Sequence, residues 1–243
     1  PAAPLAAVAS AATPAPAAAQ ARSPAPPVAT PAARPAVTAP GAPIDERKTR
    51  LALLAEEARS CIACGLHAQR RQAVFARGNP FAELCFVGEG PGADEDAQGQ
   101  PFVGKSGQLL DKMIAAMGYH RDDVYICNVV KCRPPGNRTP EPDEIQSCSP
   151  FLRAQLQSLR PHLKVIVSLG RTPTHYLLNT TAPISKLRGQ FADWNGIPLM
   201  PTFHPAYLLR TPSAKVQAWE DLKQVLGLMS QLTTTTQPAP APM

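Results

Sequence analysis

The chain of 243 residues has a formal net charge of +6, and 44% of its residues are hydrophobic, 17% charged and 5% aromatic. No run of about 18 uncharged apolar residues occurs, which argues against a membrane-spanning helix and predicts no association with a membrane. The mild basic excess is compatible with a polyanionic partner, although many soluble enzymes are equally basic.

Residues 1–43 differ from the rest of the chain in composition. Thirty of these 43 positions are Ala or Pro, two carry a charge and none is aromatic. Such a segment buries too little apolar surface to offset the entropy of ordering it, so we expect a disordered tether that could dock a protein partner. Residues 230–243, rich in Thr and Pro, are expected to form a disordered tail. Residues 44–229 are left as one domain.

Short apolar runs alternate with stretches of helical period in this domain. In chain order, the pattern predicts helix 46–60, strand 83–87, helix 105–117, strand 124–130, helix 141–159, strand 165–169, helix 171–178, paired strands 189–194 and 197–203, and helix 213–229. Pro150 is expected to break the third helix, and Ser213 to cap the last one. We therefore expect an α/β fold, a three-layer α/β/α sandwich around a central, mostly parallel four-stranded sheet.

Three of the predicted strands end in loops of unusual composition, at residues 88–104, 128–140 and 204–210. In open parallel sheets, ligands bind in the crevice beyond the carboxyl ends of the strands. We therefore expect these three loops to converge on one site.

The six cysteines fall into two groups. Cys85 and Cys127 lie within predicted strands, where a small buried hydrophobic role is expected. The other four lie at helix ends and in loops, where thiolates can face a shared metal; they are Cys61, Cys64, Cys132 and Cys148. An enzyme-sized chain that looks intracellular disfavours disulfides. Because the first pair has C-x2-C spacing and the second is wide, the spacing leaves both structural zinc and a four-iron cluster open.

The first loop, residues 88–104, is dense with glycine. It matches neither the dinucleotide fingerprint nor the phosphate-binding P-loop, and Pro101 and Phe102 would obstruct a phosphate cradle, so nucleotide triphosphate binding is rejected. Glycines instead allow the backbone to approach a flat ligand closely. Phe102 itself is expected to be either a core plug or a stacking platform.

The second loop begins with Asn128, whose amide can present one donor and one acceptor to a planar base, or can bind loop backbone. Three cations suited to phosphate follow, namely Lys131, Arg133 and Arg138. The third loop starts with His204 and continues to Arg210 through two leucines, Leu208 and Leu209. Leucines in a loop that faces nucleic acid can wedge into a base stack.

Together these motifs resemble the family 4 uracil-DNA glycosylases, the iron-sulfur branch of the uracil-DNA glycosylase superfamily. The resemblance covers about residues 50–228 and rests on GEGPGADEDAQGQPFVG at 88–104, NVVKCRPPGNRTPEPDE at 128–144, SLG at 168–170 and FHPAYLL at 203–209. It implies one [4Fe-4S] cluster, held by Cys61, Cys64, Cys132 and Cys148.

The resemblance also implies a uracil pocket and a DNA-binding edge. The pocket residues would be Gly88, Glu89, Gly90, Phe102, Asn128 and His204. Phe102 would stack on the flipped base, Asn128 would read its O4 and N3–H edge, and His204 would donate to O2 as the glycosidic bond breaks. Either Leu208 or Leu209 would fill the gap left by the extruded nucleotide. The cations expected to contact DNA are Lys131, Arg133, Arg138 and Arg210.

Two positions depart from the best-studied branch of that superfamily. Gly90 occupies the slot of a water-activating Asp, so Glu89 is the first candidate to orient water and Glu95 the second. Gly92 stands where other branches place an aromatic, so Glu95 or its loop is expected to exclude the C5 methyl of thymine. Residues 131–147 contain no histidine, which argues against the covalent bond to DNA that a related branch forms.

The function implied is that of a monofunctional glycosylase that hydrolyses the N-glycosidic bond of uracil in single- or double-stranded DNA and leaves an abasic site. The protein is expected to be monomeric and cytoplasmic. One alternative is a non-catalytic iron-sulfur DNA-binding module, tethered to a replication or repair partner. Another is a zinc-stabilised hydrolase of a different substrate, which would be colourless.

Overall fold

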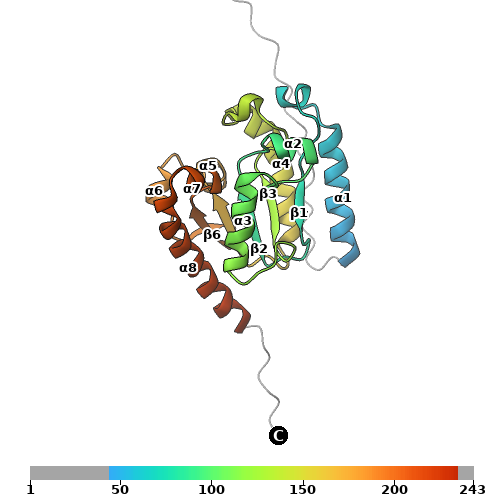
Figure 1. Cartoon of the computed structure of the whole chain (residues 1–243). Coiled ribbons are helices and arrows are strands. Elements are labelled where there is room, and N and C mark those ends of the chain that lie inside the picture. The colour runs from blue at the N-terminus through green and yellow to red at the C-terminus, as the bar shows by residue number, and fades with distance from the viewer. Residues whose placement is uncertain (1–43, 235–243) are drawn as a thin grey trace, which may run out of the picture. The chain divides into compact units, whose positions relative to one another are not determined.

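The computed structural model describes residues 44–234 (Figure 1). The predicted tether, residues 1–43, and residues 235–243 of the predicted tail lie outside the described residues. None of the helices within residues 44–234 is long and apolar enough to cross a membrane.

Six strands form one sheet in the order β1-β3-β2-β4-β6-β5. Their bounds are β1 Ala76–Gly78, β2 Leu84–Gly88, β3 Tyr125–Asn128, β4 Val165–Leu169, β5 Ala192–Trp194 and β6 Ile197–Thr202. The four central strands are parallel, and β1 and β5 pair antiparallel at the two edges. The expected four-stranded sheet is therefore two strands too small: β5 was expected to pair with β6 but was not counted in the sheet, and β1 was not expected. The strand β1 escaped prediction because three residues carry no periodic signal, and its pairing with β3 creates it.

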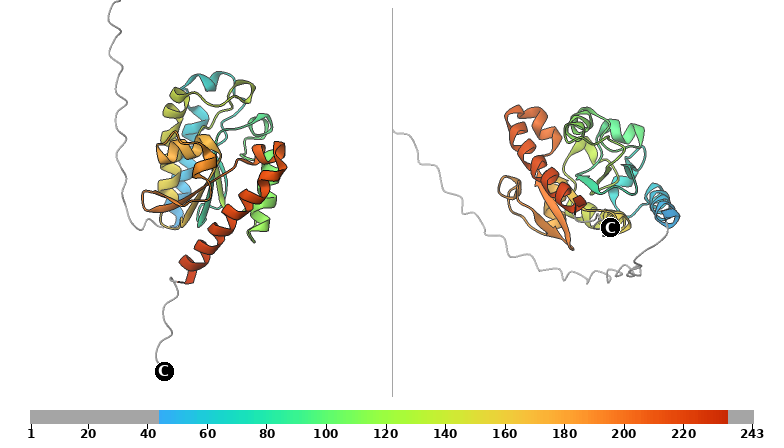
Figure 2. Two further views of the ribbon diagram at one scale, coloured as in Figure 1. Left: turned by 90° about the vertical axis from the view of Figure 1, so that its left-hand side faces the viewer. Right: turned by 90° about the horizontal axis from the view of Figure 1, so that it is seen from below.

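The helices flank the sheet on both faces. They are α1 Ile44–Ser60, α2 Ala93–Gln98, α3 Lys105–Ala116, α4 Pro142–Leu159, α5 Arg171–Leu178, α6 Ile184–Leu187, α7 Pro205–Arg210 and α8 Lys215–Thr234. Figure 2 shows α1 and α4 on one side of the sheet and α3 and α8 on the other. The three shortest, α2, α6 and α7, were not expected, because four to six residues are too few for a periodic pattern.

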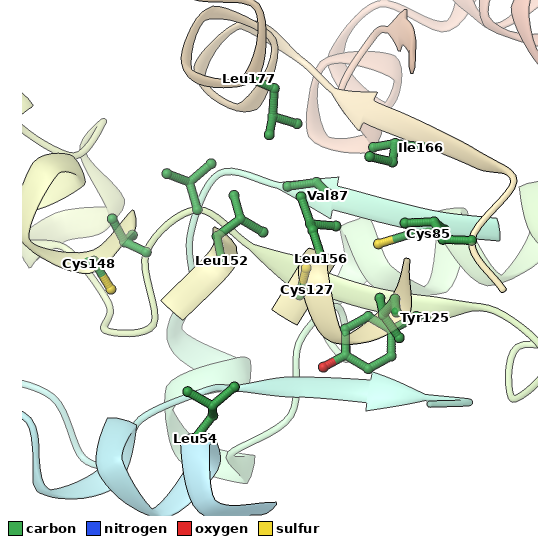
Figure 3. Close-up of a cluster of buried hydrophobic side chains, with 14 of the residues drawn as sticks. Leu54, Cys85, Val87, Tyr125, Cys127, Cys148, Leu152, Leu156, Ile166 and Leu177 are labelled. Atoms are coloured by element: carbon green, nitrogen blue, oxygen red, sulfur yellow. The ribbon is translucent and has the colours of Figure 1, made fainter. Parts of the chain in front are cut away.

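Alternate residues of β2 pack against opposite layers. Cys85 and Val87 belong to one buried cluster, with residues of α1, α4 and α5 such as Leu54, Leu156 and Leu177 (Figure 3). The intervening Leu84 and Phe86 belong to the other cluster, with residues of α3 and α8. This alternation follows from the pleat of a strand that is buried on both faces, and it fixes the carboxyl end of β2 between two packed layers.

Three expectations about the helices were wrong. The helix α4 continues through Pro150, and the Ser149 hydroxyl donates to the Gln146 carbonyl at 3.1 Å, which supplies a donor in place of the missing proline N–H. Ser213 lies inside a 3-10 turn, Pro212–Ala214, so it precedes α8 without starting it. At its other end α8 runs to Thr234, past the expected boundary at residue 229, because Leu232 still packs against the core.

Candidate functional site

A cleft of about 650 Å³ opens where the three strand-end loops meet. The loop after β2, the loop after β3 and the segment after β6 all contribute to its walls. Five of the expected pocket residues line it: Glu89, Gly90, Phe102, Asn128 and His204. The topology therefore brings together side chains that are separated by up to 115 positions in the sequence.

Gly88 does not line the cleft, but its lack of a side chain allows Phe102 and Asn128 to approach its backbone. A Cβ atom at this position would lie 2.5 Å from the Phe102 ring and 2.4 Å from Asn128 Oδ1. Phe102 is buried with a positive φ of 56°, and its ring centroid lies 5.7 Å from that of His204 at an interplanar angle of 32°. A larger residue at position 88 would therefore push the ring and the amide apart.

Asn128 is the last residue of β3 and is 1% exposed. Its Oδ1 is buried and has no hydrogen-bond partner among the described residues. A buried acceptor left unpaired costs about 1–3 kcal/mol. This oxygen therefore suits a ligand that brings an N–H donor into the cleft.

His204 precedes α7 and presents its ring to the cleft. Its Nδ1 accepts the backbone N–H of Ala206 at 3.1 Å, so the proton of the neutral ring resides on Nε2. Burial, with a smaller contribution from the charge of Arg210, lowers the pKa of His204 to about 4. At neutral pH the ring is therefore uncharged and can donate a hydrogen bond through Nε2.

The titration of His204 checks this assignment. Because burial disfavours the imidazolium, we expect the ring to stay neutral as the pH falls from 8 and to take up a proton only near pH 4. Protonation would then remove the acceptor that binds Ala206. Nuclear magnetic resonance of the labelled ring measures the midpoint, and a value near the ordinary histidine pKa of about 6.5 would contradict the buried environment.

The two candidate carboxylates are held in different ways. Glu89 accepts a hydrogen bond from the Thr172 hydroxyl of α5, which fixes the carboxylate at the cleft wall. Glu95 accepts three backbone N–H groups, from Gly92 at 3.1 Å and from Val103 and Gly104 at 2.9 Å each. Glu95 therefore closes the loop that carries Phe102, and its oxygens are already engaged.

The expected DNA-contacting residues divide into those that reach the cleft and those that do not. Arg138 and Arg210 line it, and Arg138 is oriented by an ion pair with Glu144 at 2.6 Å. Arg133 is half-buried and is not among the lining residues, although it donates at 2.7 Å to Oδ1 of Asn137, which is one of them. Lys131 was wrongly expected to contact phosphate. It is only 1% exposed, because its ammonium points into the interior.

The two leucines of α7 differ in exposure. Leu209 is 43% exposed, whereas Leu208 is 1% exposed and packs with Phe203, Ala214 and Ala218. Leu208 is therefore not available as a wedge, because the short helix turns it into the core. Of the two candidates, only Leu209 can reach a partner from the surface.

Sequence reasoning missed several residues of the cleft. Lys105 and Arg171 begin α3 and α5 and line it together with Tyr207 of α7. The signal that could have found the two cations is their position, since each directly follows a glycine at the start of a helix near the carboxyl edge of the sheet. Thr172 was missed because its partner Glu89 is 83 positions away.

Four of the cysteines gather around one small cavity beside the loop after β3. Cys61, Cys64, Cys132 and Cys148 all line it, whereas Cys85 and Cys127 are core residues, as expected. Arg70 Nη1 donates to Cys132 Sγ at 2.9 Å, and a backbone N–H donates to Cys148 Sγ at 3.2 Å. Within residues 44–234, no group of three or more Cys, His, Asp or Glu side chains is close enough to hold a single metal ion.

The chemistry of these four thiols suits a larger sulfur-ligated group. Burial raises the pKa of Cys148 to about 11, so binding must displace a proton from a desolvated thiol. The donors of Arg70 and of the loop backbone point at sulfur, as expected around thiolates that carry charge. Four thiols that face one cavity from two chain segments fit an iron-sulfur cluster.

Comparison with known proteins gives a consistent result. Residues 75–223 match the model of the uracil DNA glycosylase superfamily. The chain is 45% identical over 189 residues to the type-4 uracil-DNA glycosylase of Thermotoga maritima, covering 76% of this chain and 97% of that protein. It is 44% identical over 194 residues to that of Saccharolobus solfataricus, covering 76% and 89%. A type-5 uracil-DNA glycosylase of Pyrobaculum aerophilum is 32% identical over 150 residues, covering 54% and 64%.

Proposed function

We propose a mechanism for this site from one premise: the chain belongs to the type-4 uracil-DNA glycosylases of the uracil DNA glycosylase superfamily, and it removes uracil from DNA. The cleft takes a uracil that has been turned out of the DNA. One observation carries the proposal. Phe102, Asn128 and His204 come from three separate strand ends and line one cleft, in which Asn128 Oδ1 is buried without a partner among the described residues.

Recognition of uracil falls to Asn128. Its Oδ1 accepts the N3–H of uracil, and its amide N–H donates to O4. Cytosine carries an acceptor at N3 and an amino group at C4, which reverses both positions. Asn128 Oδ1 lies so close to the Gly88 backbone that a Cβ atom there would meet it at 2.4 Å. The amide therefore has little room to turn to the reversed pattern, and cytosine is rejected.

Bond cleavage depends on stabilising the departing base. Uracil leaves as an anion while the sugar becomes oxocarbenium-like, and His204 donates its Nε2–H to O2 as charge develops there. The His204 ring is neutral before the base binds, so it donates this hydrogen bond as an uncharged imidazole. Glu89, held by Thr172, orients the water that adds to C1′ and leaves an abasic site.

Thymine is excluded by the loop that Glu95 holds. The cleft wall beside Phe102 is built from residues 90–95, Phe102 and residues 104–106. Glu95 joins these parts by accepting the backbone N–H groups of Val103 and Gly104, and it accepts a third from Gly92 within its own segment. A C5 methyl on the base would have to displace this fixed wall. We therefore assign thymine exclusion to the closed loop as a whole.

Replacing Glu95 with alanine tests this role. Loss of charge-assisted hydrogen bonds is expected to lower the free energy of unfolding by about 2 kcal/mol. Misplacement of Phe102 should slow uracil excision about 10- to 100-fold and narrow the preference for uracil over thymine. The rates of excision from U·G and T·G duplexes measure both the slowing and the preference for uracil, with Gln98→Ala on the same helix α2 as the control. An unchanged ratio of the two rates would contradict the assignment.

The rim of the cleft binds DNA, either single- or double-stranded. Four exposed cations lie around it and suit backbone phosphates: Lys105, Arg138, Arg171 and Arg210. Leu209 projects from the same edge and fills the gap left by the extruded nucleotide in a duplex.

The two leucines of α7 make a matched pair for testing this wedge. Leu209→Ala should slow excision from duplex DNA about 10-fold and leave excision from single-stranded DNA unchanged, because only a duplex has a gap to fill. Leu208→Ala should instead lower the free energy of unfolding by about 2–5 kcal/mol, because it empties a core position. Rates on both substrates and thermal melting measure these effects. Equal slowing on both substrates by Leu209→Ala would exclude a wedge.

A [4Fe-4S] cluster at Cys61, Cys64, Cys132 and Cys148 supplies structural cross-linking when bound. These cysteines belong to two segments, one that follows α1 and one that runs from the end of β3 into α4. The cluster would therefore fasten α1 to the loop that begins with Asn128. The residues of the cleft carry out the reaction.

Incubation with an oligonucleotide that contains one uracil, followed by alkali, tests the proposed function. Cleavage at the uracil position is expected, with none where cytosine or thymine replaces it. Retained DNA binding without cleavage would indicate a non-catalytic DNA-binding module instead.

A further inference from the structure

Lys131 is a buried cation with a fixed set of contacts. Its Nζ donates to the Asn128 backbone carbonyl at 2.6 Å and to Gln155 Oε1 at 2.5 Å. It also lies 5.7 Å from the centroid of the Phe75 ring, within reach of a cation–π interaction. Two acceptors and an aromatic face of the protein therefore surround the ammonium, which does not point toward the DNA.

The acceptor Gln155 is itself held on its other side. This residue of α4 is 0% exposed, and its Nε2 donates to the Tyr125 hydroxyl and to the Phe75 carbonyl, both at 3.1 Å. Because both of its donor contacts lie in the core, Gln155 cannot follow a movement of Lys131. The chain of contacts runs from α4 through Lys131 to the end of β3.

The carboxyl end of β3 needs such a donor. Pairing with the edge strand β1 stops at Cys127, which lies opposite Ala76, so the next residue, Asn128, extends past the end of β1. A buried carbonyl at that place has to find a donor, and the ammonium supplies it. Meanwhile the Asn128 Oδ1 has no partner among the described residues, so the direction of its amide depends on the backbone that carries it.

We propose that Lys131 is a positioning residue for Asn128: its buried ammonium fixes the end of β3 so that the side-chain amide stands ready for the uracil edge. The inference rests on the proposed function of Asn128. Lys131 therefore contributes to the reaction through Asn128, without touching DNA or the base.

A double-mutant cycle tests this role in the full-length, cluster-containing protein. Lys131→Met removes the ammonium at similar length. In the wild-type background it should lower kcat for uracil excision about 100-fold with little change in KM, as expected when the reacting base is misaligned while the contacts to the DNA backbone remain. In an Asn128→Ala background the same change should alter kcat by less than about 3-fold, because the amide it positions is gone. Lys112→Met, an exposed charge loss on α3, is the control.

The remaining outcomes separate the inference from the function on which it rests. Additive losses in the two backgrounds, or a wild-type rate in Lys131→Met, would overturn the inference while the role of Asn128 stands. An unimpaired Asn128→Ala protein would overturn both. If the Lys131→Met protein lost absorbance near 400 nm in proportion to its activity, the inference would also be overturned, because Lys131 would then act through the cluster. If Lys131→Met does not fold, Gln155→Met takes its place in the cycle and should show the same non-additivity.

Discussion

Replacing His204 with alanine is expected to lower kcat for uracil release by about 100- to 1000-fold while DNA affinity changes little. In the proposed mechanism, the Nε2–H of the neutral ring acts on charge that exists only as the bond breaks. An interaction formed mainly in the transition state contributes to kcat and hardly to binding. Single-turnover excision and DNA binding, measured on the same preparation, separate the two quantities.

His120→Ala is the matched control for this change, because His120 is exposed and lies just beyond α3. It should leave both quantities unaltered. Equal weakening of DNA binding and of kcat in His204→Ala would mean that the ring contributes to ground-state affinity. In that event the assignment of His204 to the departing oxygen would fail.

Replacing Cys148 with alanine is expected to abolish absorbance near 400 nm and to lower Tm by about 10 °C. A four-iron cluster needs all four thiolates for its full ligation, and Cys148 is the one that α4 contributes. Cross-linking two segments of this separation is worth about 3–5 kcal/mol by analogy with a disulfide, which corresponds to such a shift in a domain of this size.

Cys127→Ala provides the matched control, because it removes a buried sulfur that is part of the core and not of the cluster cavity. It should cost stability but keep the colour and the iron content. A colourless wild-type protein that contains zinc, or a Cys148→Ala protein that keeps its absorbance, would contradict the proposed cluster.

Much of the site follows from sequence because of the rule for parallel strands. Phe102, Asn128 and His204 each lie at or beyond the carboxyl end of a strand, and in a parallel sheet these ends share one edge. The order of strands and loops along the chain is therefore enough to predict that these residues converge. The edge strands β1 and β5 lie away from the cleft, so the error in strand number did not affect the site.

The errors concern which way a side chain points. A lysine after a strand and next to arginines suggests a phosphate contact, and nothing local reveals that Gln155, 24 positions later, accepts from Lys131 in the core. Adjacent leucines are likewise indistinguishable without the axis of α7, which is only six residues long. Partners distant in sequence decide both cases, so local patterns cannot.

The closed loop held by Glu95 also bears on how the protein meets its substrate. Because three backbone amides are already bound to one carboxylate, the segment that carries Phe102 is organised before any encounter with DNA. The protein then loses little conformational entropy when it binds DNA. More of the binding free energy is available to flip a nucleotide out of the base stack. A preorganised binding site of this kind favours rapid sampling of many DNA sites, because no slow conformational change is needed at each one.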